Sequence, residues 1–261
     1  MLDYAPNISW LFPELPFEDR LGEVARLGFS AIEFGFPSHA DLDAVWRGKE
    51  ELGLKIVLFN QDVPVWDRAN RGYLVDPTRR DEFRHTFDEA LQIAGRLSAN
   101  KIMLPSGVEL DMPRQAQRDC MVENLAYAAP LAADADVLLT IEALNPVDNP
   151  GFFLTSSREG IEIVKAVNHK NIRFQFDTYH LQMMEGDLAQ KITENSEWIG
   201  HIQFADFPGR HEPGSGEIDF ESVISAVIAS GYDNFIGLEY LPLEKGADTL
   251  NWVAAAPRLI D

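Results

Sequence analysis

Short runs of apolar and β-branched residues recur along the chain, and each is followed by a longer segment whose apolar residues lie three and four positions apart. Short apolar runs are typical of buried strands, and the wider spacing is typical of amphipathic helices. The pattern predicts strands at residues 5–9, 31–34, 55–59, 101–104, 137–142, 172–177, 200–204 and 235–240. It predicts helices at residues 17–27, 40–52, 78–97, 114–133, 157–167, 188–198 and 220–229, with a helical tail from residue 247.

Several of the predicted helices carry residues that favour a helix end. Gly28, Gly53 and Gly231 each follow a predicted helix, where a left-handed residue commonly closes the last turn. Ser157 and Asp219 each stand at a predicted helix start, where a side-chain oxygen can accept hydrogen bonds from the first turn. These residues support the placement of the helices.

The strict alternation of strands and helices predicts a fold of the α/β class. Parallel strands joined by right-handed crossovers follow from such alternation, and eight units without a break in composition favour a closed (β/α)₈ TIM barrel. The predicted domain is a single one over residues 1–261, and a Gly-rich phosphate loop after the first strand is missing, which disfavours a dinucleotide-binding sheet. The longest irregular connection, residues 60–77, is expected to form a lid or substrate loop over the carboxyl ends of the strands.

Composition and charge exclude several kinds of partner. The formal net charge is −20, which argues against a nucleic-acid partner because such binding depends on clustered Lys and Arg. No run of apolar residues reaches the length of a membrane helix, and the amino-terminal residues lack the pattern of a secretion signal, so we expect a cytoplasmic protein. The single cysteine, Cys120, excludes an internal disulfide and is expected to pack as a small apolar side chain.

Polar side chains follow four consecutive predicted strands, which is where a barrel gathers its catalytic groups. Glu142 and Asp177 end the fifth and sixth strands, and Gln203 and Glu239 lie near the ends of the seventh and eighth. One such acid alone is explained by a strand that has reached water. Three carboxylates close together repel one another unless a cation holds them ionised, and oxygen ligands without a thiolate favour Mn²⁺ or Mg²⁺.

Longer strings carry a resemblance to a known family. FPELPFEDRL, EALNP, FDTYHLQMMEG, GHIQFAD, RHEPGSGEI and GLEY resemble the hydroxypyruvate isomerase family, one of the xylose-isomerase-like TIM barrels, which also include ketose 3-epimerases and 2-oxo-tetronate isomerases. The similarity covers nearly the full length. It implies one divalent cation held by Glu142, Asp177, Gln203 and Glu239. It also implies that the two glutamates are the catalytic acid and base.

The resemblance also implies residues that contact the substrate. His180 and Arg210 match substrate-contacting positions, although a packing histidine and a surface arginine are the simpler interpretations of each alone. In the loop at residues 60–77 the chain keeps Arg71 of the family's pattern and adds Trp66, which we expect to form an apolar wall for the substrate. Dimers or tetramers are implied by the resemblance only.

The chain departs from the family at Leu241, where hydroxypyruvate isomerases usually have lysine. A missing cation weakens the case for hydroxypyruvate and favours a neutral ketose, a larger sugar acid or a sugar derivative. We expect a metal-dependent sugar or keto-acid isomerase that transfers a proton through an enediolate; a ketose 3-epimerase and an inosose-dehydratase-like lyase are the alternatives. The charge and the small number of histidines disfavour an apurinic-site endonuclease, and the presence of all four ligands disfavours an inactive sugar-binding barrel.

Overall fold

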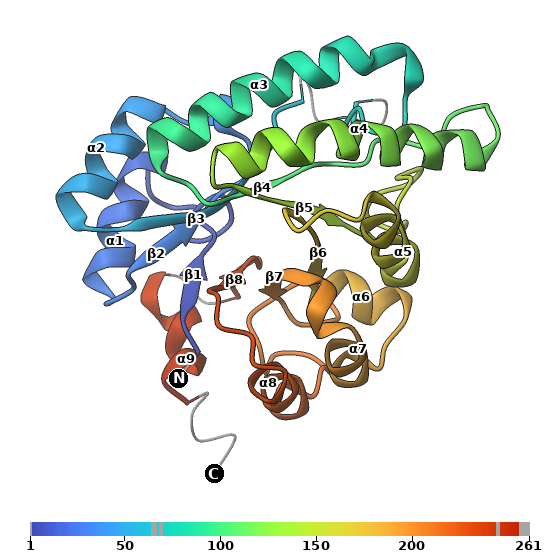
Figure 1. Cartoon of the computed structure of the whole chain (residues 1–261). Helices are drawn as coiled ribbons and strands as arrows, with labels where there is room; N and C mark the ends of the chain where they lie inside the picture. The colour runs from blue at the N-terminus through green and yellow to red at the C-terminus, as the bar shows by residue number, and fades with distance from the viewer. Residues whose placement is uncertain (1, 64–66, 68–69, 244–245, 256–261) are drawn as a thin grey trace.

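In the computed structural model, which describes residues 2–63, 67, 70–243 and 246–255, the strands form one barrel (Figure 1). Eight strands are found within these ranges: β1 (Tyr4–Pro6), β2 (Ala31–Glu33), β3 (Lys55–Asn60), β4 (Lys101–Met103), β5 (Leu138–Glu142), β6 (Ile172–Asp177), β7 (Ile199–Phe204) and β8 (Ile236–Leu238). Their order is β1-β8-β7-β6-β5-β4-β3-β2, with parallel pairing. The backbone N–H of Ile8 donates to Glu33 O across the remaining seam, so the (β/α)₈ prediction is confirmed.

The helices lie outside the barrel, as Figure 1 shows. They are α1 (Arg20–Arg26), α2 (Leu42–Leu52), α3 (Arg80–Leu97), α4 (Arg114–Asp134), α5 (Ser157–Val167), α6 (Thr178–Met184), α7 (Leu188–Asn195), α8 (Phe220–Ala229) and α9 (Asn251–Ala255). Short 3₁₀ turns occur at Phe17–Asp19, Pro37–His39, Pro77–Arg79, Ser196–Trp198 and Gly246–Leu250. None of the described helices is both long enough and apolar enough to cross a membrane.

Three local features differ from the sequence prediction. The first strand ends at Pro6, because the carbonyl of Asn7 accepts the N–H groups of Trp10 and Leu11 and the chain turns there. Helix α6 was not predicted; it begins directly after β6. Ser157 is the first residue of α5 rather than its cap, and the neighbouring Ser156 accepts the hydrogen bond from the first turn.

Strand β6 shows how the alternating pattern divides the barrel into two layers. Phe174 points outward to α5, where a side chain at Gly160 would meet its ring at 2.5 Å. Gln175 points inward, because its side chain bonds to Thr140 of β5 and Gln203 of β7. The outward layer is therefore an apolar core between strands and helices, and the inward layer holds polar groups.

Cys120 lies in α4 and is buried, as expected for a packing residue. Asp219 caps α8 by accepting a hydrogen bond from the backbone N–H of Ser222, as predicted. These two residues have structural explanations and lie outside the candidate site.

Candidate active site

The carboxyl ends of β5, β6 and β8 bring three acids to the same rim of the barrel. The strand register sets Glu142 beside Gln175 and Asp177 beside Gln203, and Glu239 directly follows β8. Glu142 and Asp177 are buried, and the side chain of Glu239 is 15% exposed. The predicted convergence of strand-end acids is therefore present in the fold.

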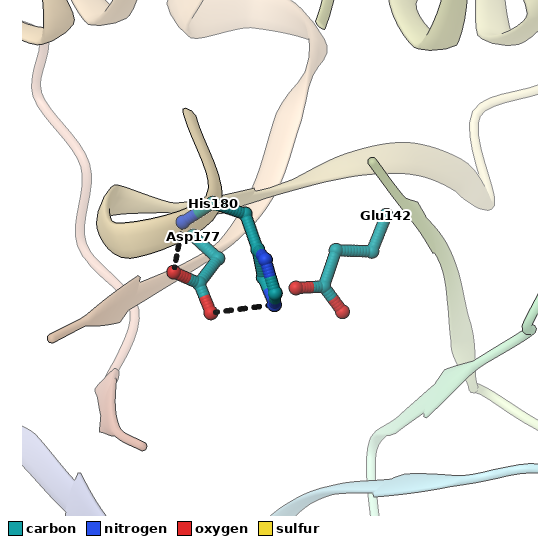
Figure 2. A group of neighbouring side chains, drawn as sticks. All are labelled: Glu142, Asp177 and His180. Atoms are coloured by element: carbon teal, nitrogen blue, oxygen red, sulfur yellow. Dashed lines mark hydrogen bonds and ion pairs between the residues drawn. The ribbon is translucent and has the colours of Figure 1, made fainter. Parts of the chain in front are cut away.

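Glu142, Asp177 and His180 form a compact group of potential metal ligands (Figure 2). One ligand atom from each lies within 4.8 Å of the others. Glu142 Oε2 accepts a hydrogen bond from Gln175 Nε2 at 3.0 Å, whereas Oε1 is buried without a hydrogen-bond partner among the described residues. An unpaired buried carboxylate oxygen is costly, so the donor set fits a divalent cation at this point.

Both oxygens of Asp177 are engaged. Oδ1 caps α6 by accepting the backbone N–H groups of Tyr179 at 2.8 Å and His180 at 3.2 Å. Oδ2 accepts a hydrogen bond from Arg210 Nη2 at 3.1 Å, and the same nitrogen lies 3.2 Å from Glu239 Oε1. Arg210 thus joins two of the acids, so it belongs to the site and is not a surface cation.

Burial shifts the pKa values of all three acids upward. Burial raises the pKa of Glu142 well above its usual range, and the charges of Asp177 and Glu239 raise it further. Burial raises the pKa of Glu239 to about 8, although Arg210 opposes this shift. Burial also raises the pKa of Asp177 despite Arg210. A divalent cation among these groups would favour their ionised forms.

His180 is held in one tautomer by its neighbour Asn145. The backbone N–H and the side-chain Nδ2 of Asn145 both lie within hydrogen-bond distance of His180 Nδ1, at 3.2 and 2.7 Å. The Asn145 Oδ1 already accepts the N–H groups of Val147 and Asp148, so its amide nitrogen faces the ring. Burial and Arg210 lower the pKa of His180, so the ring is neutral with its proton on Nε2. That nitrogen is a donor 4.0 Å from Asp177 Oδ2, so His180 in this tautomer is not a metal ligand and suits contact with a substrate oxygen.

Gln203 contacts the acid group at Glu239, where its side-chain hydrogen bond opposes the rise in the pKa of that acid. Gln203 Oε1 accepts a hydrogen bond from Gln175 Nε2 at 2.8 Å, and its Nε2 donates to Glu33 Oε1 at 2.7 Å. The structure places Glu142 and Asp177 in one compact group, connects Glu239 to Asp177 through Arg210, and connects Gln203 to Glu142 through Gln175. All four remain predicted ligands.

A cavity of about 690 Å³ opens above these groups. Glu142, Glu239, His180, Arg210 and Arg71 all line it. Leu241 and Asp148 line the same cavity, and Trp66 lies outside the described residues. The cavity combines the proposed acid and base with two cationic side chains.

Sequence reasoning missed the residues beneath the site. Glu33 ends a short apolar run, AIE, in the same way that Glu142 ends TIE, so the criterion that identified Glu142 would also have found Glu33. Gln175 lies two residues before Asp177 and therefore on the same face of β6. Both signals were present in the sequence, but the hydrogen bonds that give these residues a role join distant strands.

The parallel eight-stranded barrel and the acids at its strand ends place the protein in the class of barrel enzymes. Comparison with known proteins identifies the family. Residues 21–256 match the family model described as "Xylose isomerase-like TIM barrel". The chain is 38% identical to 2-oxo-tetronate isomerase of Cupriavidus necator, over 96% of each chain. It is 35% identical to hydroxypyruvate isomerase of Escherichia coli, over 97% of this chain and 98% of that one.

A solved structure named as an AP endonuclease, family 2, from Brucella melitensis superposes with a TM-score of 0.94. It is 35% identical and covers 98% of this chain and 99% of its own. The chain thus belongs to the xylose isomerase-like TIM barrel family, and its near-full-length similarity to the two named isomerases makes it an enzyme of the isomerase class. The resemblance read from the sequence motifs is confirmed.

Proposed function

We propose that the protein is a metal-dependent isomerase of short 2-oxo sugar acids, with four-carbon 2-oxo-tetronates as the best substrates. The observation that carries the proposal is the buried Glu142 carboxylate, which has one unpaired oxygen, lies within reach of Asp177 and lines one cavity together with Glu239. The names of the relatives support the class of substrate, because one acts on a 2-oxo-tetronate and another on hydroxypyruvate.

The cavity accommodates a short sugar acid. Its volume of about 690 Å³ holds a three-carbon or a four-carbon acid. Arg71 lines the cavity together with the acids and is the side chain that we assign to the substrate carboxylate, since a guanidinium matches the geometry of a carboxylate. Leu241, where the related isomerases usually have lysine, adds apolar surface to the same wall.

Two glutamates carry the proton transfer in this proposal. One removes a proton from the carbon that bears the hydroxyl, and the proton returns to the neighbouring carbon through the same or the opposite glutamate. The hydroxyl proton passes to the former carbonyl oxygen, so the product has the same composition as the substrate. Glu239 and Glu142 both line the cavity, so both carboxylates face the space that the substrate would occupy.

The remaining polar groups orient the substrate and its charge. A divalent cation, Mn²⁺ or Mg²⁺ given the oxygen ligands, supplies positive charge where negative charge develops on the carbonyl oxygen. Glu142, Asp177, Gln203 and Glu239 are the residues that we propose to hold it. The Nε2–H of His180 donates a hydrogen bond to a substrate oxygen, and Arg210 balances the charge of Asp177 and Glu239.

A nuclease activity is the main competing hypothesis, because the name of the Brucella structure denotes an endonuclease. The formal charge of −20 opposes DNA binding. Among the described residues, His180 is the only histidine in the group of potential metal ligands. Both observations disfavour a nuclease, and a cleavage assay on DNA with an apurinic site is expected to show no product.

A substrate panel tests the proposed activity. The protein loaded with Mn²⁺ or Mg²⁺ is assayed with 2-oxo-tetronates, hydroxypyruvate, ketopentoses and ketohexoses, and products are identified by mass and chromatography. We expect the highest kcat/KM on a 2-oxo-tetronate, with a product of unchanged mass. A product lighter by the mass of one water molecule would indicate a lyase. A product inverted at one carbon would indicate an epimerase. Either result contradicts the proposal.

The substrate preference depends on Leu241. In Leu241→Lys, an added cation on the cavity wall is expected to raise kcat/KM for hydroxypyruvate relative to a neutral ketopentose by about tenfold, the effect of one charge-assisted hydrogen bond. The ratio of the two kcat/KM values measures the effect. If this ratio is the same in Leu241→Lys and in the unsubstituted protein, Leu241 does not select the substrate.

A further inference from the structure

A second polar cluster lies inside the barrel beneath the candidate site, and the proposed chemistry does not use it. Its centre is Glu33 at the end of β2, which is fully buried. Glu33 Oε1 accepts hydrogen bonds from Asn7 Nδ2 at 3.0 Å and Gln203 Nε2 at 2.7 Å. Glu33 Oε2 lies 2.8 Å from His201 Nε2. Only one of these partners, Gln203, is also a predicted metal ligand.

Two of the three partners are fixed as donors by other contacts. Asn7 Oδ1 accepts the backbone N–H of Ser9 at 3.0 Å, so its amide nitrogen must face Glu33. His201 Nδ1 lies 3.3 Å from Lys101 Nζ, and because an ammonium group only donates, the proton of the neutral ring is on Nε2, toward Glu33. Glu33 is therefore held as an acceptor by groups that do not belong to the candidate site.

This arrangement fixes the orientation of Gln203. Since Glu33 Oε1 already accepts from Asn7 Nδ2, Gln203 turns its amide nitrogen toward that oxygen, and its own Oε1 then points to Gln175 Nε2 at 2.8 Å. The other N–H of Gln175 donates to Glu142 Oε2 at 3.0 Å. A directed series of hydrogen bonds thus runs from Glu33 to Glu142 and leaves Glu142 Oε1 as the unpaired oxygen.

Strand β8 leaves space for the Glu33 carboxylate. A Cβ atom at Gly237 would lie 2.3 Å from Glu33 Oε2 and 2.5 Å from Oε1, closer than real atoms approach. The carboxylate can occupy its position between Asn7, His201 and Gln203 because residue 237 has no side chain. The geometry of this cluster consequently depends on β7, which carries His201 and Gln203, and on β8, as well as on β2.

We propose that Glu33 is a positioning residue, which turns the oxygen of Gln203 toward Gln175 and, through Gln175, selects the oxygen of Glu142 that remains available to the cation. An inverted Gln203 amide would set its nitrogen against Gln175 Nε2, and Gln175 would lose the acceptor that orients it toward Glu142. The inference rests on the proposed cation site, so it is tested by metal binding alone. Absence of Mn²⁺ binding to the unsubstituted protein would overturn the proposed function and this inference together.

Calorimetric titration with Mn²⁺ tests the role of Glu33. Glu33→Gln replaces an acceptor by a group that also donates, and we expect Mn²⁺ affinity to fall by about tenfold to a hundredfold, the effect typical of groups that orient metal ligands. Glu185→Gln is the matched control, because Glu185 likewise only accepts, from Ser157 of α5, and is expected to leave the affinity unchanged. Affinity of Glu33→Gln within about twofold of the unsubstituted protein would overturn the inference.

An exchanged pair separates orientation from folding. In the double variant Glu33→Gln with Gln203→Glu, the new glutamate presents an oxygen in either orientation and accepts a hydrogen bond from the new glutamine. We expect Mn²⁺ affinity to return to within about threefold of the unsubstituted protein, well inside one order of magnitude. A double variant as weak as Glu33→Gln, with both folded by circular dichroism, would show that Glu33 does not act through Gln203.

A glycine substitution tests the same role without removing any hydrogen-bonding group. Gly237→Ala places a methyl group against the Glu33 carboxylate and is expected to weaken Mn²⁺ binding by about tenfold. Gly95→Ala is the matched control, because Gly95 lies in α3 and an added Cβ meets nothing within 4 Å. Equal Mn²⁺ affinity of the two alanine variants would overturn the inference. This test does not depend on whether Glu33→Gln folds.

Discussion

Glu33 and Glu142 are the same residue type in nearly the same local setting, yet their surroundings differ. Each ends a short apolar strand, and each is buried inside the barrel. Both oxygens of Glu33 are satisfied, by Asn7, Gln203 and His201. Glu142 has one partner, Gln175, and one unpaired oxygen. The protein completes the hydrogen bonding of the first carboxylate and leaves that of the second incomplete.

The pKa shifts of the two acids reflect the same difference in surroundings. Burial raises the pKa of Glu33 to about 7, and hydrogen bonds from Gln203 and Asn7 oppose the shift. Burial raises the pKa of Glu142 well above its usual range, and its acidic neighbours add to the shift. A buried acid surrounded by donors is a structural element, whereas a buried acid surrounded by acids fits a site for a cation. The comparison therefore separates structure from function in one barrel.

The largest expected difference is in turnover. Glu142→Gln is expected to reduce kcat by about a thousandfold or more, because a proton-transfer group and a cation ligand are both lost. Its free energy of unfolding without metal is expected to stay equal or rise, since a buried carboxyl that resists ionisation is replaced by a neutral amide. Steady-state kinetics and urea unfolding measure the two quantities.

Glu33→Leu is the contrasting variant. It is expected to lower the free energy of unfolding by about 3 kcal/mol, because the donors of Asn7, Gln203 and His201 are left without an acceptor. Urea unfolding at neutral pH measures the loss. If Glu142→Gln were the more destabilising of the two substitutions, the assignment of roles to the two acids would be wrong.

The pH dependence of stability gives a smaller effect. Because the pKa of Glu239 is raised from its usual value near 4.5 to about 8 in the folded protein, its contribution to stability is complete below about pH 4.5 and is lost as the pH rises through about 8. The metal-free protein is therefore expected to lose stability between pH 6 and pH 8, and the increase in Tm caused by Mn²⁺ is expected to be larger at pH 8.

Thermal unfolding at the two pH values, with and without Mn²⁺, measures this effect. Glu239→Gln serves as the control, since it removes the titrating group and should flatten part of the pH dependence. A metal-free protein whose Tm rises from pH 6 to pH 8 would contradict the raised pKa of the acid group.

The smallest effect is expected at a residue that belongs to neither cluster. Asp219 caps α8 through the backbone N–H of Ser222, and Asp219→Ala is expected to lower the free energy of unfolding by about 1 kcal/mol. Because α8 lies outside the barrel, kcat and Mn²⁺ affinity should not change. If Asp219→Ala lowers kcat by more than its loss of stability explains, the outer helices influence the site.

Much of the barrel could be predicted because each strand is short, apolar and followed by an amphipathic segment. The strands β5 and β6 were placed within one residue of their observed bounds. Helix α6 was missed because it follows β6 without a connecting turn, and Asp177 is both the end of the strand and the cap of the helix. A residue with two roles leaves no separate boundary in the sequence.

The convergence of Glu142, Asp177 and Glu239 could also be predicted, since strand ends of a parallel barrel share one rim. The role of Glu33 could not be, because its hydrogen bond to Gln203 joins residues 170 positions apart and depends on the orientation of an amide. The tautomer of His180 likewise depends on Asn145, 35 positions away. Residue spacing along the chain carries no information on such contacts.

The most direct test of the cation site is a Mn²⁺ titration of the unsubstituted protein beside Glu142→Gln, with turnover of a 2-oxo-tetronate measured at each metal concentration. We expect the unsubstituted protein to bind one equivalent and to gain activity in proportion to occupancy. We expect Glu142→Gln to bind at least about a hundredfold more weakly, because a ligand with an unpaired buried oxygen is replaced. Equal Mn²⁺ affinity of the two proteins, or full turnover in the metal-free protein, would contradict the account.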